Sequence, residues 1–345
     1  MMKKYLFLII ISLLSKLSKS IEDLKEHNSV SKLISMVRTE MIDKSLQDLP
    51  RRKEVQFLQM VSKMINARKE YSLNEAESAY LVFKWISENI QVNYYDKDLD
   101  DPINVYNSGK GTPKALSSLF NNFSYYLKIV SDSISGYLKG VNYMNYDIQS
   151  DRNYTWNYVE IKGEYYLLDV SMVADIEFRE SYPEFIYLYF GTEPEIFIRQ
   201  HFPKESKWQL LSEPYTFEKF ESMALLNPFF YLLGFKTISP DTTKIIGDVK
   251  IILTSDKSIP KLDLVSDCFN EFGILTGSLD EYEDGSPDEK LEIDYRNEDE
   301  CSLYSISIKQ NYTNTYVTIF DYSINYQINS SLDFKRMIIP KSNIE

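Results

Sequence analysis

The chain has 345 residues, of which 43% are hydrophobic and 14% aromatic, so it can bury the cores of two globular domains and is not an intrinsically disordered chain. Its formal net charge of −13 argues against nucleic-acid binding, because phosphate contacts need clustered Lys and Arg. Beyond the N-terminus, no stretch of the sequence is long and apolar enough to span a bilayer.

The first twenty residues have the pattern of a secretory signal peptide. A basic "MMKK" is followed by the apolar run "YLFLIIISLL" and by small residues at Ser18 and Ser20. Residues 1–20 are therefore predicted to be cleaved, with an uncleaved anchor as the alternative. We expect a secreted protein with no transmembrane span after cleavage, and cell-surface or secretory-organelle retention stays open. Sequons agree weakly with secretion and predict glycosylation at Asn122, Asn153, Asn311 and Asn329.

The chain has only two cysteines, Cys268 and Cys301. In an oxidising compartment they can form a disulfide, which we predict, and two buried free thiols are the alternative.

Two helices are expected in the first third, after a charged, helix-prone segment over 21–60. The first follows a possible capping box at Ser72 and Glu75, and contains Trp85 as a core residue. Its buried face is predicted from apolar spacing to hold Ala76, Ala79, Tyr80, Phe83, Ile86 and Ile90. The second has Thr112 as N-cap and Pro113 at its first position, where a missing N–H costs nothing. Its apolar stripe is Leu116, Leu119, Phe120, Phe123 and Leu127.

Strand patterns begin near Ile134. They include "ISGYLKGV", a hairpin over 153–169 with its turn at Lys162-Gly163, and "FIYLYFGT". A short helix, "TFEKFESMA", is expected after Pro214. Beyond about residue 245, short alternating strands separated by polar turns predict a β-sandwich: "VKIILT", "FGILTGSL", "LEIDY", "SLYSISI", "TYVTIFDY" and "YQIN".

Five segments, in order, resemble the transglutaminase-like superfamily, a branch of the papain-like cysteine enzymes, and in particular its kyphoscoliosis-peptidase type. They are "FKWISENIQVNYYD", "GTPKALSSLF", "SGYLKG", "YTWNYVEIKGEYYLLDVS" and "HFPKESKWQLL". The resemblance implies an α+β fold with a transglutaminase-like (papain-like) core over 61–215. It also implies an Ig-like β-sandwich over 241–345, with 216–240 as the linker.

The resemblance also implies that most of a catalytic triad has been replaced. The family's nucleophilic cysteine falls on Pro113, two residues after the matched Gly111, and its histidine falls on Tyr154. Proline has no nucleophile, and the phenol of tyrosine, with a pKa near 10, is a poor base at neutral pH. The third position retains Asp169. The retained Trp156 and Asn157 are candidate cleft-binding residues, although a core role is favoured for Trp156.

Other residues offer weaker candidates for chemistry. Ser117 and Ser118 lie off the nucleophile position and would be unactivated without a neighbouring histidine. His201 is interpreted as a satisfied structural histidine, in a segment that the family keeps apart from its triad. Asp169, with no histidine at position 154, is expected to bond Tyr154 or to cap local backbone.

The acidic stretch over 278–300 is interpreted as a solvated loop, because Tyr282 and Leu291 occupy positions where a calcium loop needs oxygen ligands. We find no metal-binding spacing and no motif for a cofactor.

The sequence thus favours a secreted, catalytically inactive transglutaminase- or protease-like protein, without cofactor or metal, that binds a protein, peptide or glycan. Two alternatives stay open. One is a residual hydrolase or transferase with a non-cysteine nucleophile, and the other is a structural or adhesive protein that binds through its C-terminal sandwich.

Overall fold

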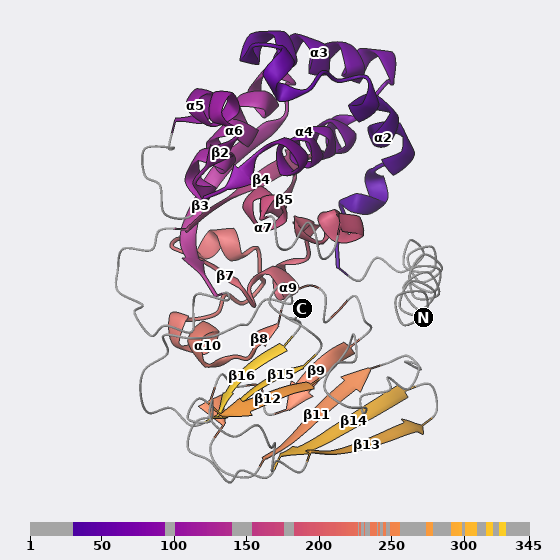
Figure 1. Cartoon of the computed structure of the whole chain (residues 1–345). Coiled ribbons are helices and arrows are strands. Elements are labelled where there is room, and N and C mark those ends of the chain that lie inside the picture. The colour runs from indigo at the N-terminus through magenta and orange to yellow at the C-terminus, as the bar shows by residue number, and fades with distance from the viewer. Residues whose placement is uncertain are drawn as a thin grey trace, which may run out of the picture.

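The computed structural model (Figure 1) describes 30–93, 101–139, 154–175, 183–226, and, further along, separate strands and a few single residues between 228 and 328. The predicted signal segment, Cys268, and the sequons at Asn153, Asn311 and Asn329 lie outside the described residues. So does most of the predicted acidic loop, over 279–290. The predictions made on these residues stay predictions.

The N-terminal part is helical and covers one side of the molecule (Figure 1). Its helices, in chain order, are η1 (Ile34–Met36), α2 (Thr39–Gln47), η2 (Arg52–Glu54), α3 (Phe57–Glu70), α4 (Glu75–Asn89), α5 (Pro102–Ser108) and α6 (Pro113–Tyr126). Between them, β1 (Gln91–Val92) and β2 (Lys110–Gly111) form a short parallel pair.

Helix α4 is the central helix, and its predicted apolar face is fully buried. Leu81 and Val82, outside that face, also have no exposed surface, whereas the side chains of Lys84 and Glu88 are partly exposed. The predicted capping box was wrong by two residues. Asn74 is the N-cap and Glu77 completes the box, because Ser72 lies in the turn after α3 with a φ of +48° and cannot take the extended N-cap conformation.

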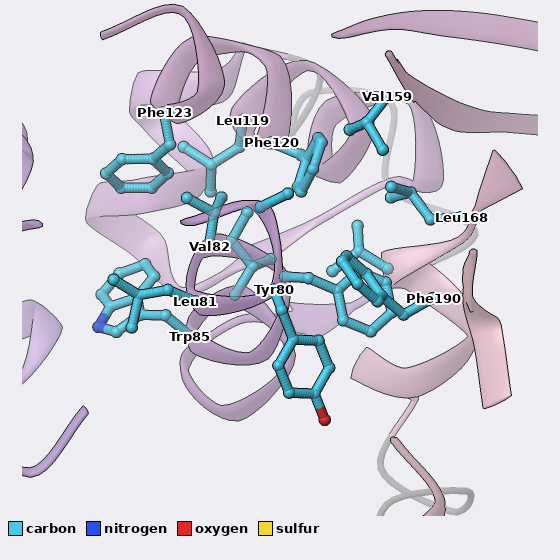
Figure 2. Close-up of a cluster of buried hydrophobic side chains, with 14 of the residues drawn as sticks. Tyr80, Leu81, Val82, Trp85, Leu119, Phe120, Phe123, Val159, Leu168 and Phe190 are labelled. Atoms are coloured by element: carbon cyan, nitrogen blue, oxygen red, sulfur yellow. The ribbon is translucent and has the colours of Figure 1, made fainter. Parts of the chain in front are cut away.

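Helix α6 begins as the sequence predicts. Thr112 Oγ1 accepts a hydrogen bond from the amide of Ala115 at 3.2 Å, and Pro113 is the first helical residue. All five predicted stripe residues are buried. Figure 2 shows the core that results, where side chains of α4 and α6 meet Val159, Leu168 and Phe190.

A five-stranded sheet packs against α6. Its order is β6-β5-β4-β3-β7, with β3 (Val130–Leu138), β4 (Tyr154–Ile161), β5 (Glu164–Leu168), β6 (Phe190–Thr192) and β7 (His201–Pro203). The predicted hairpin is confirmed as β4–β5, and its turn residues Lys162 and Gly163 have φ values of 55° and 82°, as a type I′ turn requires.

One expected strand is mostly helical. "FIYLYFGT" begins within the 3-10 helix η5 (Pro183–Tyr189), and only Phe190–Thr192 join the sheet as β6. A short apolar run does not distinguish a buried strand from a buried helical turn by periodicity, and here Leu188, Tyr189 and Phe190 are buried in both types of element.

The two faces of β4 look toward different environments. The amide of Asn157 bonds the backbone of α6, and Val159 belongs to the main core beneath that helix. Tyr154 and Trp156 point to the other face and join a second, smaller cluster with Phe197. This alternation follows from the two-residue period of a strand. It places the residues of the resemblance on two different sides of the sheet.

The remaining helices among the described residues up to 226 are short. They are α7 (Val170–Ala174), α9 (Pro194–Phe197), η6 (Ser206–Gln209) and α10 (Phe217–Ser222), the last one starting at the predicted site, with Thr216 as N-cap. Across the helices of the described residues, none combines the length and apolarity that crossing a membrane requires.

The C-terminal strands form two sheets. The first has the order β13-β14-β11-β9, and the second has the order β10-β16-β15-β12, with β8 (Leu225–Leu226) added to β16. The other strands are β9 (Phe235–Ser239), β10 (Lys244–Ile245), β11 (Val249–Ser255), β12 (Ile274–Ser278), β13 (Leu291–Glu298), β14 (Cys301–Ile308), β15 (Thr315–Ile319) and β16 (Ile324–Ile328). All six predicted strands of this region occur, and the whole chain is a mixed helix-and-sheet protein.

Candidate functional site

The start of α6 is the position that the resemblance matches to a nucleophile. Gly111 leads into it, and a Cβ there would lie only 2.6 Å from a methyl group of Val105, so the close approach requires glycine. Pro113 follows at the first helical position and is buried. A helix N-terminus stabilises a thiolate, but the side chain at this position is a saturated ring.

Asp169, the residue between β5 and α7, is a fully buried acidic group. Its side chain has no exposed surface and caps α7, with Oδ1 accepting from the amides of Ser171 at 2.8 Å and Met172 at 3.3 Å. Its own amide donates to the carbonyl of Tyr189 at 2.9 Å. The predicted capping role of Asp169 is confirmed.

The second oxygen of Asp169 holds a histidine. His201 Nε2 lies 2.9 Å from Asp169 Oδ2, and both side chains are fully buried. Of the two alternatives expected for Asp169, the backbone cap is found, and among the described residues the hydroxyl of Tyr154 does not bond to Asp169. The segment of His201, predicted to lie apart from the triad positions, thus contacts one of them. The pairing arises because β7 adds to β3 and Leu138 lies opposite His201, a contact between segments distant in sequence.

Aromatic rings enclose the imidazole of His201. It stacks on Phe197 with ring centroids 3.9 Å apart. The ring of Trp156 is steeply inclined to it, with ring centroids 5.1 Å apart. His201 Nδ1 is buried and has no hydrogen-bond partner among the described residues, so the histidine is only half satisfied. A bare Nδ1 favours the tautomer with the proton on Nε2, which then donates to Asp169. In this tautomer the Nε2 proton of His201 is donated to the carboxylate of Asp169.

Tyr154 shares this face of the sheet. It is buried, and its ring centroid lies 6.0 Å from that of His201 and 6.5 Å from that of Trp156. The structure therefore brings together Tyr154, Trp156, Asp169 and His201.

Asn157, the other retained residue, lies on the opposite face. Its Nδ2 donates to the carbonyl of Ser117 at 3.1 Å and to Asn121 Oδ1 at 2.9 Å. Both candidate cleft residues, Trp156 and Asn157, are buried. In this conformation they support the packing of α6 and of the histidine enclosure rather than an open surface.

The two serines have structural partners. Ser117 Oγ lies 2.7 Å from Ser133 Oγ and donates to the carbonyl of Trp156 at 3.2 Å. The carbonyl of Ser118 accepts from Asn122 Nδ2 at 2.9 Å, the same nitrogen to which a glycan would be attached. Neither serine hydroxyl contacts a histidine within the described residues.

The Asp169–His201 pair is the feature that sequence reasoning missed. The two residues lie 32 positions apart, and no local spacing links them. The only available signal is that His201 stands at the start of a strand-like "HFP" segment. Cys301 opens β14, and its predicted disulfide partner is outside the described residues. Within the described part of the chain, no three His, Cys, Asp or Glu side chains are grouped as metal ligands.

Comparison with known proteins finds relatives of this chain. It is 25% identical to kyphoscoliosis peptidase of Mus musculus over 202 residues, covering 55% of this chain and 30% of the mouse protein. It is 24% identical to the Lim and transglutaminase domain protein ltd-1 of Caenorhabditis elegans over 179 residues, covering 46% and 24%. The chain thus matches less than a third of either relative. No family model matches.

Among solved structures, the chain resembles a TGase with a TM-score of 0.25 and 12% identity, over 46% of this chain and 37% of that one. A TM-score this low carries no argument of its own.

Proposed function

We propose that this chain, which is related to the transglutaminase-like superfamily through kyphoscoliosis-peptidase-like relatives, is a catalytically inactive member of that group that acts by binding. The observation that carries the proposal is the chemistry at the three matched positions. Pro113, at the position matched to the nucleophile, has no thiol. Tyr154, at the position matched to the histidine, offers a phenol and not an imidazole. Asp169 caps α7 and bonds to His201.

The alternative of a non-cysteine enzyme has less support. A serine nucleophile needs a base within hydrogen-bond reach. Ser117 is instead bonded to Ser133 and to the carbonyl of Trp156. His201 is the one histidine among the described residues. Its Nε2 bonds to Asp169, and its ring stacks on Phe197.

We further propose that the protein is secreted after cleavage near Ser20, and that its two C-terminal sheets pack as an Ig-like β-sandwich. The signal-peptide pattern supports the first statement. The strand orders β13-β14-β11-β9 and β10-β16-β15-β12 support the second, because a sandwich is built from two sheets of this size, and their pairings are antiparallel except for the two-residue parallel pair β10–β16. The partner is a protein, peptide or glycan.

Turnover assays test the proposal of inactivity. The full chain is incubated with a glutamine-containing peptide, and hydrolysis of its backbone amides and exchange of its side-chain amide are both measured. We expect no turnover above buffer. A matched variant, Asp169→Asn, keeps an acceptor oxygen for the cap and separates contamination from chemistry. Turnover by the wild-type chain that disappears in this variant while the fold is retained would contradict the proposal.

A further inference from the structure

A surface hollow of about 350 Å³ lies beside the β4–β5 turn, and neither Asp169 nor His201 lines it. Residues of β5 and of the chain that leaves β6 form its walls, and Lys32 contributes from the N-terminal segment. Its principal side chains are Lys32, Glu164, Tyr165, Glu193, Pro194 and Leu210. A hollow of this size can accommodate one long side chain together with the backbone that carries it.

Strand β5 has an open edge at this hollow. On one side, all of β5 pairs with β4. On the other side, β6 pairs only with Leu167 and Leu168, and within the described chain no strand pairs with Glu164–Tyr166 on that side. Strand β6 is itself flanked by Ser31, which bridges to Thr192. An open strand edge presents backbone groups that an added strand can pair with.

The hollow is acidic. Glu164 Oε2 accepts from Lys32 Nζ at 3.0 Å and from the hydroxyl of Tyr166 at 2.7 Å, and Glu193 Oε1 accepts from the amide of Lys32 at 2.9 Å. The second oxygen of each carboxylate has no hydrogen-bond partner among the described residues. Burial raises the pKa of Glu193, and the neighbouring Glu195 raises it further. Because the hollow has two carboxylates, of Glu164 and Glu193, and one ammonium group, of Lys32, its charge favours a cationic ligand.

Aromatic side chains lie on the other face of β5 at the same strand edge. Tyr165 is 46% exposed, and its ring packs edge-on against Trp208 at 5.7 Å and Tyr158 at 5.4 Å. Trp208 in turn stacks on Tyr158 at 4.3 Å, which fixes the platform. Successive side chains of a strand point to opposite faces. A strand added here would therefore place one set of side chains near the carboxylates and the alternate set near Tyr165.

We propose that this β5-edge site, defined by Lys32, Glu164–Leu167 and Glu193, binds an extended basic peptide segment that adds a strand to β5. A Lys or Arg side chain of the segment enters the hollow and pairs with the two carboxylates, and apolar residues at alternate positions pack on Tyr165. The inference names a partner class and does not depend on whether the triad positions are inactive.

Fluorescence anisotropy with the full-length protein tests the site. The probe is a fluorescein-labelled peptide of three Val-Lys repeats, and the matched probe has three Val-Glu repeats. We expect binding of the Lys peptide only. The double variant Glu164→Gln/Glu193→Gln keeps the acceptor oxygens for Lys32 and should weaken binding about fivefold to tenfold. Glu40→Gln, an exposed substitution on α2, should leave binding unchanged. Equal binding of both probes, or equal binding by the double variant, would overturn the proposal.

A second measurement separates strand addition from simple charge attraction. A Val-Lys peptide with alternate N-methylated backbone nitrogens keeps its charge but cannot complete a strand ladder. We expect it to bind at least tenfold more weakly, and we expect the normal peptide to slow hydrogen exchange of the backbone amides within 164–166 that point away from β4. Equal affinity of the methylated peptide, or unchanged exchange at these amides, would rule out strand addition. Neither result depends on the turnover assays, so the two proposals can fail separately.

Discussion

Two fully buried carboxylates, Glu77 and Asp169, cap helices in this fold, and only one of them stands at a position that the resemblance makes catalytic. Glu77 Oε2 accepts from the amide of Asn74 at 2.9 Å, and Arg38 binds both oxygens, at 2.5 and 2.8 Å. Asp169 accepts from α7 amides and from His201.

The two carboxylates differ in their partners. Arg38 is always charged and half exposed, so it can return to water. His201 is buried and aromatic rings enclose it. In both cases capping and a side-chain partner use both oxygens of the carboxylate. The helix cap and the contact with His201 give Asp169 a sufficient structural role, so an aspartate at this position does not by itself indicate catalysis.

The variant Asp169→Ala tests the structural role of Asp169 and is expected to have the largest effect. It removes an N-cap and leaves His201 buried without an acceptor, so we expect the free energy of unfolding to fall by about 3–5 kcal/mol. Denaturant titration followed by tryptophan fluorescence measures the change, because Trp85, Trp156 and Trp208 all lie in this part of the chain. Asp169→Asn is the matched control and should cost clearly less. A loss under 1 kcal/mol for the alanine variant would refute the structural explanation.

The enclosure around His201 can be tested without changing either charge. A Cβ at Gly136 would lie 2.2 Å from the carbonyl of Phe202 and 2.4 Å from the ring of Trp156. We expect Gly136→Ala to destabilise the fold by about 2–3 kcal/mol through overpacking. Gly163→Ala is the matched control, since it meets no atom within 4 Å and costs about 1 kcal/mol through its positive φ alone. Equal losses in the two variants would show that the enclosure is loose.

Glu77→Gln examines the other carboxylate of the comparison. We expect a loss of about 1–2 kcal/mol, smaller than for Asp169→Ala because Arg38 can rehydrate. Burial alone would raise the pKa of Glu77, but hydrogen bonds from Arg38 and Asn74 outweigh it and the pKa lies below its ordinary value of 4.5. This stabilisation is therefore present above pH 4.5 and lost as the pH falls below it. Acid titration of the Gln variant should lack that component, and identical acid curves would contradict the pairing.

The buried side chain of Lys139 is expected to have the smallest effect on stability. Lys139 Nζ donates to the carbonyls of Phe220, Glu221 and Met223. Burial lowers the pKa of Lys139 to about 7, with Glu221 opposing the shift. Between pH 7 and 10.5 the unfolded chain holds a proton that the folded chain has lost, so this group makes stability rise with pH. Lys139→Met should flatten that rise in chemical denaturation curves, and equal slopes would contradict the burial of a titrating ammonium.

Much of the fold could be predicted because local chemistry determines it. Thr112 and Pro113 start α6 as expected, and the Lys162-Gly163 turn closes the hairpin in the expected register. The capping box was placed two residues early, because Ser72–Glu75 and Asn74–Glu77 both match the pattern and only the positive φ of Ser72 decides between them.

The candidate site was harder to predict. The resemblance pointed to Pro113, Tyr154 and Asp169 as matched positions, but it did not predict the contact between Asp169 and His201. His201 reaches Asp169 only because β7 pairs with the far edge of β3, and long-range pairing has no local signature. The β5-edge site was missed for the same reason, since the hollow depends on where β6 ends and on Lys32 returning to Glu164.

The most direct measurement for the central claim is the intact mass of the full-length wild-type chain after incubation with an excess of a hydroxyl-reactive fluorophosphonate, followed by peptide mapping. With Pro113 as the first residue of α6 and Ser117 bonded to Ser133, no activated nucleophile is expected at the start of α6. The account predicts an unchanged mass. A single stoichiometric adduct that maps to residues 111–118, and that the Asp169→Asn variant does not form, would contradict it.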